Sequence, residues 1–451
     1  YVVSQLVVAA WFARRVRSET DYLLAGRSLG PWLGTFSVFA TWYGAETCIG
    51  AAGEAYASGM SGVLADPFGY TLGMVAFGLF FAAGLWRRGL VTLADLFRPR
   101  WGVGVERLAA LIMIPSSVMW AAAQIRAFGQ ILASVSEVGL LVAITLAALV
   151  VILYTAIGGM WADAVTDLVQ GVVLIAGVLV LFGVFIALGG AEQLAAQPTT
   201  RLDPTHGRST LDALETLAIP IFSTIAAQEL ASRALSMRGA RLAARATVGA
   251  GALYLVLGLL PMMVGLGAGA FIGDDQESEQ VLSLFAQQYL PMPLYVLFLG
   301  ALVSAILSTL SGALLVAGSL LAHNVVAPLF PRVRESGRVR LDRAAVVLFG
   351  ILAYAIALAS DSIYALVQES SALGTAGILV LLVFGLWLPR VGARPSAYAA
   401  LVVGTLSYLI GAHVLELEAP YLLSLGLALA AYLLAVPFSR EPQTPPAADP
   451  C

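Results

Sequence analysis

The sequence contains no lysine and few charged residues of either sign. All 24 of its basic residues are arginine, and charged residues account for 11% of the 451. Soluble proteins carry charge on roughly a quarter of their residues, so this composition excludes an ordinary soluble domain. The net charge is −3 and most of the arginines lie in short loops, which leaves no basic face for binding nucleic acid.

Cysteine and histidine are also scarce. The two cysteines, Cys48 and Cys451, provide neither a disulfide framework nor the ligand spacing of a zinc site. The three histidines, His206, His323 and His413, are not clustered, and no nucleophile motif stands in a suitable setting. We therefore expect a protein that is not an enzyme. The sequence also lacks the repeated carbonyl filter or charge ring that marks a passive channel.

Long apolar runs, by contrast, recur along the whole chain. Hydrophobic residues make up 60% of it, and the mean hydropathy is +0.89. About 20 apolar residues in a helix cross the hydrocarbon core of a bilayer, which is about 30 Å thick. We therefore predict an all-α integral protein of the cell membrane, with the lipid bilayer around it and no separate soluble domain.

We expect about 13 transmembrane helices. The predicted spans are residues 1–13, 31–58, 61–86, 105–135, 138–157, 160–189, 212–235, 242–272, 292–325, 342–360, 363–389, 395–413 and 419–438. The first span is short and no initiating methionine precedes it, so we expect a truncated leading helix. Arginines load every second loop, and Arg233, Arg238, Arg241 and Arg245 are counted with one of these loops. The positive-inside rule then predicts an outside amino terminus and a cytoplasmic tail, 439–451.

Two of the apolar segments are poor continuous helices. Residues 38–50 contain glycine and Glu46 at the expected midplane, and residues 218–229 contain Pro220 and Glu229. The two segments lie in the second and the seventh predicted spans, five spans apart, which is the spacing of two five-helix repeats that each begin with a broken helix. Paired breaks indicate the central site of a transporter, because unwound carbonyls and half-helix ends face each other there.

A cluster of hydroxyls interrupts the apolar helix expected near residues 292–322. Within the run 304–311, Ala305, Ser308 and Thr309 stand at i, i+3 and i+4 and share one helix face. Hard cations select such oxygen ligands, so the face is a candidate sodium site. The alternative is that these hydroxyls bond back to the preceding turn or to a neighbouring helix.

The segment 154–170 resembles the signature of the sodium/solute symporter family, and the run 304–311 is similar to that family's sodium-binding helix. The resemblance covers nearly the whole chain. It implies one membrane transporter domain, 1–451, with the LeuT-type fold of two inverted five-helix repeats. These would be 31–189 and 212–389, preceded by the leading helix 1–13 and followed by two extra helices in 395–438.

The same resemblance implies a sodium ion as the coupling ion and names its ligands. They would be the carbonyls of Ala40, Tyr43 and Ala305 and the hydroxyls of Ser308 and Thr309. Some members of the family hold a second sodium with an aspartate that aligns with Asp167 and with hydroxyls on the helix of Ser308. Here Ser311 is present, but Gly312 replaces the next serine of the family and leaves one ligand missing. Alternatively, Asp167 is a buried acid paired across helices.

The solute site is expected between the two breaks. The segments around Trp42, Tyr70 and Trp120 resemble the high-affinity choline transporter branch of the family, whose aromatics face a quaternary ammonium. Aromatic faces attract cations by about 0.5–2 kcal/mol each. The branch has a further tryptophan that is replaced here near Ala227. The candidate substrate-binding residues are Trp42, Glu46, Thr47, Tyr70, Trp120, Gln124, Gln228 and Glu229.

The charge of the expected midplane bears on the solute independently. Its acidic residues are Glu46, Asp66, Asp167, Glu229 and Glu369, and they face one basic residue, Arg126. An acidic, aromatic-lined cavity favours a cationic or zwitterionic amine, with Glu229 or Glu46 as counter-charge. Alternatively, Arg126 clamps the carboxylate of an amino acid, or it is paired internally. An uncharged solute and a transport-like membrane sensor stay open as further alternatives, and no obligatory protein partner is evident.

Overall fold

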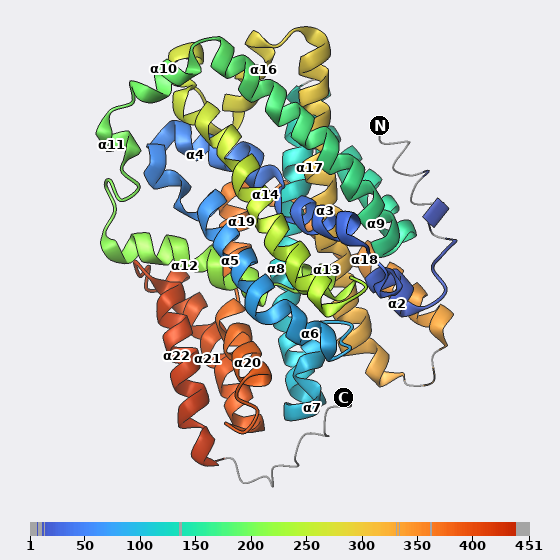
Figure 1. The fold of residues 1–451 in the computed structure, drawn as a ribbon. Helices are drawn as coiled ribbons and strands as arrows, with labels where there is room; N and C mark the ends of the chain where they lie inside the picture. Colours follow the sequence, from blue (N-terminus) through green and yellow to red (C-terminus); the bar gives the residue numbers. More distant parts are fainter. Residues whose placement is uncertain are drawn as a thin grey trace.

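The computed structural model describes residues 7, 11–12, 14–134, 138–330, 332, 334–360 and 363–438. These residues form a helical bundle without a sheet in the described part; one isolated bridge joins Leu29 and Met237. Figure 1 shows the long helices running side by side, with α20–α22 along one flank. The predicted leading helix 1–13, except for residues 7, 11 and 12, and the predicted tail 439–451 lie outside the described residues.

The helices differ widely in length. The longest are α8 (Val103–Ser134), α9 (Leu140–Ala187), α14 (Ala240–Gly267), α17 (Met292–Ser319), α18 (Glu335–Ala359) and α21 (Arg394–His413). Helices of intermediate length are α3 (Pro31–Trp42), α12 (Thr210–Ala226), α19 (Ile363–Ala372), α20 (Thr375–Leu386) and α22 (Pro420–Leu434). The short ones are α2 (Glu19–Leu24), α4 (Ala51–Ser58), α5 (Tyr70–Ala76), α6 (Ala83–Arg87), α7 (Arg98–Trp101), α10 (Gly190–Ala195), α11 (Thr199–Leu202), α13 (Gln228–Leu235), α15 (Gly269–Ile272) and α16 (Val281–Tyr289).

Several predicted spans are joined into longer, bent helical segments. Among the described residues, 9 helical segments are long and apolar enough to cross a membrane, and α12 with α13, bent by 40°, makes 10. One segment covers 46–87 and joins two predicted spans through π-helical turns. Another is α9, where 138–157 and 160–189 meet at Gly159 with a φ of +61°. The number 13 therefore stays a prediction.

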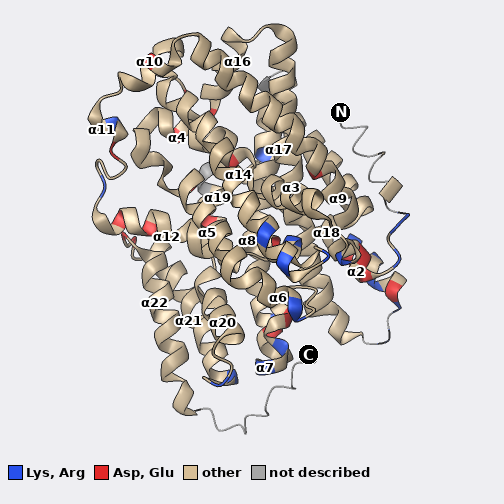
Figure 2. Cartoon of the chain, in the orientation of Figure 1, with Lys and Arg blue, Asp and Glu red and all other residues tan. Residues whose placement is uncertain are grey.

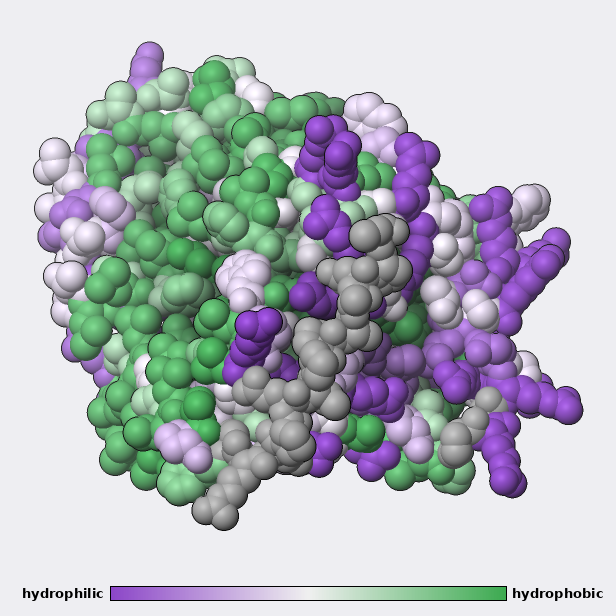
Figure 3. Space-filling view, turned by 60° about the horizontal axis from the view of Figure 1, so that its bottom comes forward, coloured by the Kyte–Doolittle hydropathy of each residue, from purple (hydrophilic) through white to green (hydrophobic). Residues whose placement is uncertain are grey.

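The helix α17 lies at the centre of the bundle. It packs against α8, α9 and α18, and every residue from Ser304 to Ser319 on it is buried. Around this core, apolar side chains face outward: Leu149 on α9 is 55% exposed and Leu348 on α18 is 55% exposed. Figure 3 shows hydrophobic residues covering a broad face of the molecule while hydrophilic residues gather at one side. An apolar exterior with polar groups inside is the pattern of a protein surrounded by lipid.

Most of the arginines lie at one end of the bundle. Figure 2 shows the arginines gathered around α2, α6, α7 and α13. Hydrogen bonds and ion pairs join several elements at this end: His323 contacts Glu19 at 2.8 Å and Asp95 at 3.2 Å, and Arg338 contacts Glu19 at 3.1 Å. The polar network is consistent with the prediction that the arginine-rich loops lie on one side of the membrane. The assignment of that side to the cytoplasm stays a prediction.

Arg233 is an exception to the predicted loop pattern. The sequence assigned it to an arginine-rich loop with Arg238, Arg241 and Arg245, and these three are exposed. Arg233 is instead 1% exposed and lies inside the bundle on α13. The assignment of Arg233 to that loop was therefore wrong. The half-helix α13 ends at Leu235, where the predicted span 212–235 also ends, so Arg233 belongs to the half-helix after the second break.

Candidate functional site

The first predicted break lies at the end of α3. The helix stops at Trp42, and Tyr43 takes a non-helical conformation with φ −82° and ψ 76°. The N–H of Gly44 donates to the carbonyl of Trp42 at 3.0 Å, and the N–H of Ala45 donates to Oε1 of Gln124 at 3.1 Å. In an uninterrupted helix these two donors would serve the carbonyls four residues earlier, those of Ala40 and Thr41. The break therefore frees two carbonyls inside the bundle.

The hydroxyls of α17 face this break. Oγ1 of Thr309 donates to the carbonyl of Ala40 at 3.2 Å. Gly44 makes the approach possible, because a Cβ there would lie 2.8 Å from Oγ1 of Thr309 and 2.9 Å from Oε1 of Gln124. Ala305 is 1% exposed and lies on the same helix one turn away.

The other candidate sodium ligands have different surroundings. Ser308 donates a short hydrogen bond to Asp167. Ser304, one turn earlier, bonds back to the carbonyl of Gly300 at 2.7 Å, as hydroxyls in membrane helices often do. The side chain of Tyr43 points away from the break, and its hydroxyl donates to the carbonyl of Leu257 at 2.9 Å. The structure thus brings Ala40 and Thr309 into contact, with Ser308 beside them.

Two carboxylates on α9 stand opposite two serines on α17. Asp167 accepts hydrogen bonds from Ser308 and, at 2.7 Å, from Oγ of Ser37. Asp163, one turn away on α9, accepts a short hydrogen bond from Ser311 and forms an ion pair with Arg233. The sequence grouped Ser311 with Asp167, whereas the structure pairs it with Asp163. Asp163 stands within the segment 154–170, four residues before Asp167, so that spacing was a signal for it.

The charge balance of the interior differs from the one counted on the sequence. Asp163 and Arg233 are both buried and were missing from that count. Arg126 donates to the carbonyl of Ala357 on α18 at 3.4 Å and does not line the cavities described below. Glu369 accepts from the hydroxyl of Tyr408 at 3.2 Å. The predicted span 212–235 already contained Arg233, but Arg233 was counted with the loop arginines Arg238, Arg241 and Arg245 and not with the charges of the interior.

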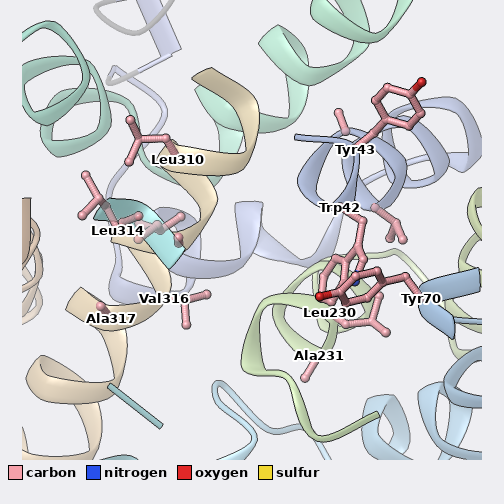
Figure 4. Close-up of a cluster of buried hydrophobic side chains, with 14 of the residues drawn as sticks. Trp42, Tyr43, Tyr70, Leu230, Ala231, Leu310, Leu314, Val316 and Ala317 are labelled. Atoms are coloured by element: carbon pink, nitrogen blue, oxygen red, sulfur yellow. The ribbon is translucent and has the colours of Figure 1, made fainter. Parts of the chain in front are cut away.

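A cavity opens between the two breaks. It is lined by Trp42, Tyr70, Met113, Ser116, Ser117, Trp120, Ser223, Thr224, Ala226, Ala227, Gln228, Glu229, Ser370, Ser371, Leu373, Gly374, Thr375 and Ile378. The three predicted aromatics are among them. The rings of Trp42 and Trp120 meet edge to face with 5.4 Å between their centres, and Nε1 of Trp42 donates to Thr224 at 3.3 Å. Figure 4 shows Trp42 and Tyr70 beside each other, with Tyr43 on the other side of the chain.

Polar groups at the second break complete the cavity wall. Ala227 is extended, with φ −74° and ψ 128°, and it separates α12 from α13. Glu229, 6% exposed, accepts a hydrogen bond from Oγ of Ser117 at 2.5 Å. Gln228 also lines the cavity, and its Oε1 accepts from the N–H of Leu93 at 2.5 Å. The carboxylate of Glu229 is therefore the acidic group of this cavity in the described part of the chain.

The remaining candidate substrate-binding residues lie around this cavity. Glu46 lines a smaller neighbouring cavity, which shares Tyr70 and Ser371 with the first one. Thr47 faces away from both cavities, since its hydroxyl donates to Asp66 at 2.8 Å. Gln124 is outside both linings as well, and its amide oxygen binds the N–H of Ala45 at the first break. The structure thus gathers Trp42, Tyr70, Trp120, Gln228 and Glu229 in one cavity and separates Thr47 and Gln124 from them.

Comparisons with known proteins agree with this architecture. The model of the sodium:solute symporter family matches residues 22–404. The chain is 26% identical to the high-affinity choline transporter 1 of Caenorhabditis elegans, over 91% of this chain and 76% of that protein. It is 27% identical to the high affinity choline transporter 1 of Homo sapiens, over 87% of this chain and 75% of that protein. A solved structure of a substrate-bound, outward-open Na+-coupled sialic acid symporter superposes with a TM-score of 0.87 at 18% identity, covering 98% of this chain and 96% of that one.

These matches confirm two predictions made from the sequence. The structural likeness extends over nearly all of the chain, which confirms the all-α LeuT-type fold. The family match spans most of the described residues, and its members are transporters and not enzymes. The chain belongs to the sodium:solute symporter family.

Proposed function

We propose that this sodium-coupled symporter imports a small cationic or zwitterionic amine of the choline type, and that the cavity between the two breaks is its solute site. The observation that carries the proposal is the pairing of Trp42 and Trp120 with the carboxylate of Glu229 in one buried cavity. Two aromatic faces and one acid are the groups that recognise an ammonium when water is excluded. The choline transporters among the relatives support the same solute class.

The sodium site proposed for the coupling ion lies beside this cavity. Its oxygens are the carbonyls of Ala40, Tyr43 and Ala305 and the hydroxyls of Ser308 and Thr309. The 3.2 Å contact between Thr309 and the carbonyl of Ala40 supports it, because it brings oxygens of α17 and α3 together and a hard cation is held by several oxygen ligands. Trp42 in the solute cavity is two residues from Ala40, so order at the first break affects both sites.

Coupling follows from this shared segment. Sodium and solute both favour the conformation in which residues 38–50 are ordered against α17, so each raises the affinity of the other by the same factor. A membrane potential of 100 mV contributes about 2.3 kcal/mol per charge, and a tenfold sodium gradient adds about 1.4 kcal/mol. One sodium ion thus supports accumulation of the solute by roughly several-hundred-fold, and a cationic solute gains from the potential directly.

The finer topology belongs to the same proposal. The breaks at Tyr43 and Ala227 would open two inverted repeats, 31–189 and 212–389, with the extra helices in 395–438. The arginine-rich end of the bundle would face the cytoplasm, so that the amino terminus is outside and the carboxyl tail is inside. Transport then proceeds by alternating access around the fixed central site.

Uptake into proteoliposomes tests the proposal. Radiolabelled choline should accumulate above its external concentration when sodium is outside and should only equilibrate when potassium replaces it. The variant Glu229→Gln should lower the affinity for choline by at least tenfold. In the native protein, proline should not inhibit choline uptake when it is added at the concentration of choline. Sodium-driven uptake of proline or another carboxylate, lost in Arg126→Gln and kept in Glu229→Gln, would instead support the carboxylate alternative. The contact of Arg126 with Ala357, away from the cavity lining, disfavours that alternative.

A further inference from the structure

A buried arginine stands next to the proposed sodium site. Arg233 is 1% exposed and lies on α13, directly after the second break. Its guanidinium forms an ion pair with Asp163 on α9, and its Nε donates to Oγ1 of Thr41 on α3 at 2.9 Å. Thr41 is the neighbour of Ala40, whose carbonyl receives the hydrogen bond from Thr309. One side chain thus connects the second broken helix to the first.

The two carboxylates of α9 differ in the charge of their partners. Asp163 meets the fixed charge of Arg233, whereas Asp167 meets two neutral hydroxyls, those of Ser37 and Ser308. An ionised carboxylate buried in a protein interior needs a compensating charge. Asp163 has one that belongs to the chain, Arg233. The hydrogen bonds of Asp167 come from neutral hydroxyls, so a sodium ion at its partner Ser308 would be the cation that compensates it when ionised.

Gly312 provides the room for this arrangement. A Cβ at that position would lie 2.6 Å from Nη2 of Arg233 and 3.5 Å from Cγ2 of Thr41. Three interactions hold the guanidinium in place, with Asp163, with Thr41 and, at 2.7 Å, with the sulfur of Met160. A larger side chain at 312 and the guanidinium therefore compete for the same space. This is the position where the family resemblance placed a serine that is missing here.

We infer that Arg233 is a built-in cation that compensates Asp163, so that this symporter binds one sodium ion and not two. The guanidinium occupies the space beside Ser311 and Gly312 that a second ion would need. The inference rests on the proposed sodium site at Ala40, Ser308 and Thr309. It makes Arg233 a positioning residue, since its charge acts through Asp163 and Thr41 and it is not itself a ligand of the ion.

Equilibrium binding of radiolabelled ²²Na⁺ to the purified full chain tests the inference without a solute. The native protein should bind one ion per chain, with a Hill coefficient near one. In the variant R233Q/G312S, which removes the guanidinium and restores a hydroxyl, Asp163 loses its cation. A second ion should then bind, and the Hill coefficient should rise toward two. Arg126→Gln, the matched control at another arginine inside the bundle, should leave the count at one.

A charge-matched variant separates electrostatics from packing. In R233Q/D163N both charges disappear together, so binding should stay at one ion per chain while R233Q/G312S reaches two. Two ions on the native protein would overturn the inference, and so would one ion on R233Q/G312S. If that variant fails to fold, the native count and the R233Q/D163N count still decide the matter. Binding of no sodium to the native protein would instead contradict the sodium site on which the inference rests.

Discussion

Thr309 on α17 and Ala40 on α3 are joined by a 3.2 Å hydrogen bond from a hydroxyl to a backbone carbonyl, although 269 residues separate them in sequence. The carbonyl is available because the N–H of Gly44 is directed to Trp42 instead of to Ala40. The hydroxyl of Thr309 is available as donor because it is directed to α3. The hydroxyl of Ser304, in contrast, bonds back to Gly300 within α17. Oxygens from two distant segments therefore meet at one point inside the bundle.

Removing the hydroxyls at this point should weaken sodium binding. Thr309→Val keeps the shape of the side chain, and Ser308→Ala removes the neighbouring oxygen. We expect the sodium concentration for half-maximal uptake to rise at least tenfold in the double variant, equivalent to about 1.4 kcal/mol. Ser304→Ala is the matched control, since its hydroxyl bonds to Gly300 within the helix, and it should change this concentration by less than about twofold. Unchanged sodium activation in the double variant would exclude both hydroxyls as ligands.

The aromatic pair of the cavity should distinguish a charged from an uncharged solute. Trp42 and Trp120 meet edge to face at 5.4 Å, so Trp42→Phe keeps an aromatic face there and Trp42→Ala removes it. For a quaternary ammonium we expect Trp42→Ala to weaken the apparent affinity by about tenfold and Trp42→Phe by only about threefold, given about 0.5–2 kcal/mol per face. Competition of choline and of an uncharged isostere of choline with the uptake of radiolabelled choline measures the affinity of each variant for the charged and for the uncharged compound. Equal losses in both variants would indicate shape packing alone.

The sequence predicted the features of the site that depend on local chemistry. Glycine and charge inside the apolar segment 38–50 indicated the first break, and the i, i+3, i+4 spacing placed Ser308 and Thr309 on one face. Side-chain direction after the break could not be predicted in this way. Glu46–Gly50 forms a π-helical turn, which changes the angle between successive residues, and Thr47 consequently faces Asp66 and not the cavity.

Arg233 illustrates what a linear pattern leaves out. The predicted span 212–235 ends where α13 ends and already contained Arg233. Its ion-pair partner Asp163 is 70 residues away in sequence, so the residues next to Arg233 gave no sign of that partner. The resemblance to the family implied that the acid at 167 lies at the site, but only the packed structure shows that two acids there, Asp163 and Asp167, are bound by three serines and one arginine.

The close approach at Gly44 gives a backbone test of the first break. A Cβ at this position would lie 2.8 Å from Oγ1 of Thr309, too close for an unstrained contact. Gly44→Ala should therefore separate α3 from α17 and reduce sodium-dependent uptake by more than about tenfold. Gly300→Ala on α17 is the matched control, because a Cβ there meets nothing within 4 Å. If Gly44→Ala transports normally with unchanged sodium dependence, the contact at the break is not required.

The charged network at the arginine-rich end should make stability depend on pH. Burial by itself would raise the pKa of Glu19, but hydrogen bonds and charge from His323 and Arg338 outweigh it and hold that pKa below its ordinary value. The pKa of Asp95 is lowered in the same way, against burial, by His323 and by backbone N–H groups. A lowered carboxyl pKa stabilises the folded protein above the ordinary value of about 4 and loses this effect as the pH falls through the folded pKa.

We therefore expect the melting temperature in detergent to fall steeply as the pH is lowered below about 4. His323 is the shared partner of both acids, at 2.8 Å from Glu19 and 3.2 Å from Asp95, so His323→Gln should lower the melting temperature at neutral pH and flatten its acid dependence. The free energy of unfolding at neutral pH should fall by about 1–3 kcal/mol, the magnitude for a buried hydrogen bond to a charged group. His206→Gln, in the loop between α11 and α12, is the control and should leave the profile unchanged. An identical acid dependence in His323→Gln and the native protein would show that the lowered carboxyl pKa values have another cause.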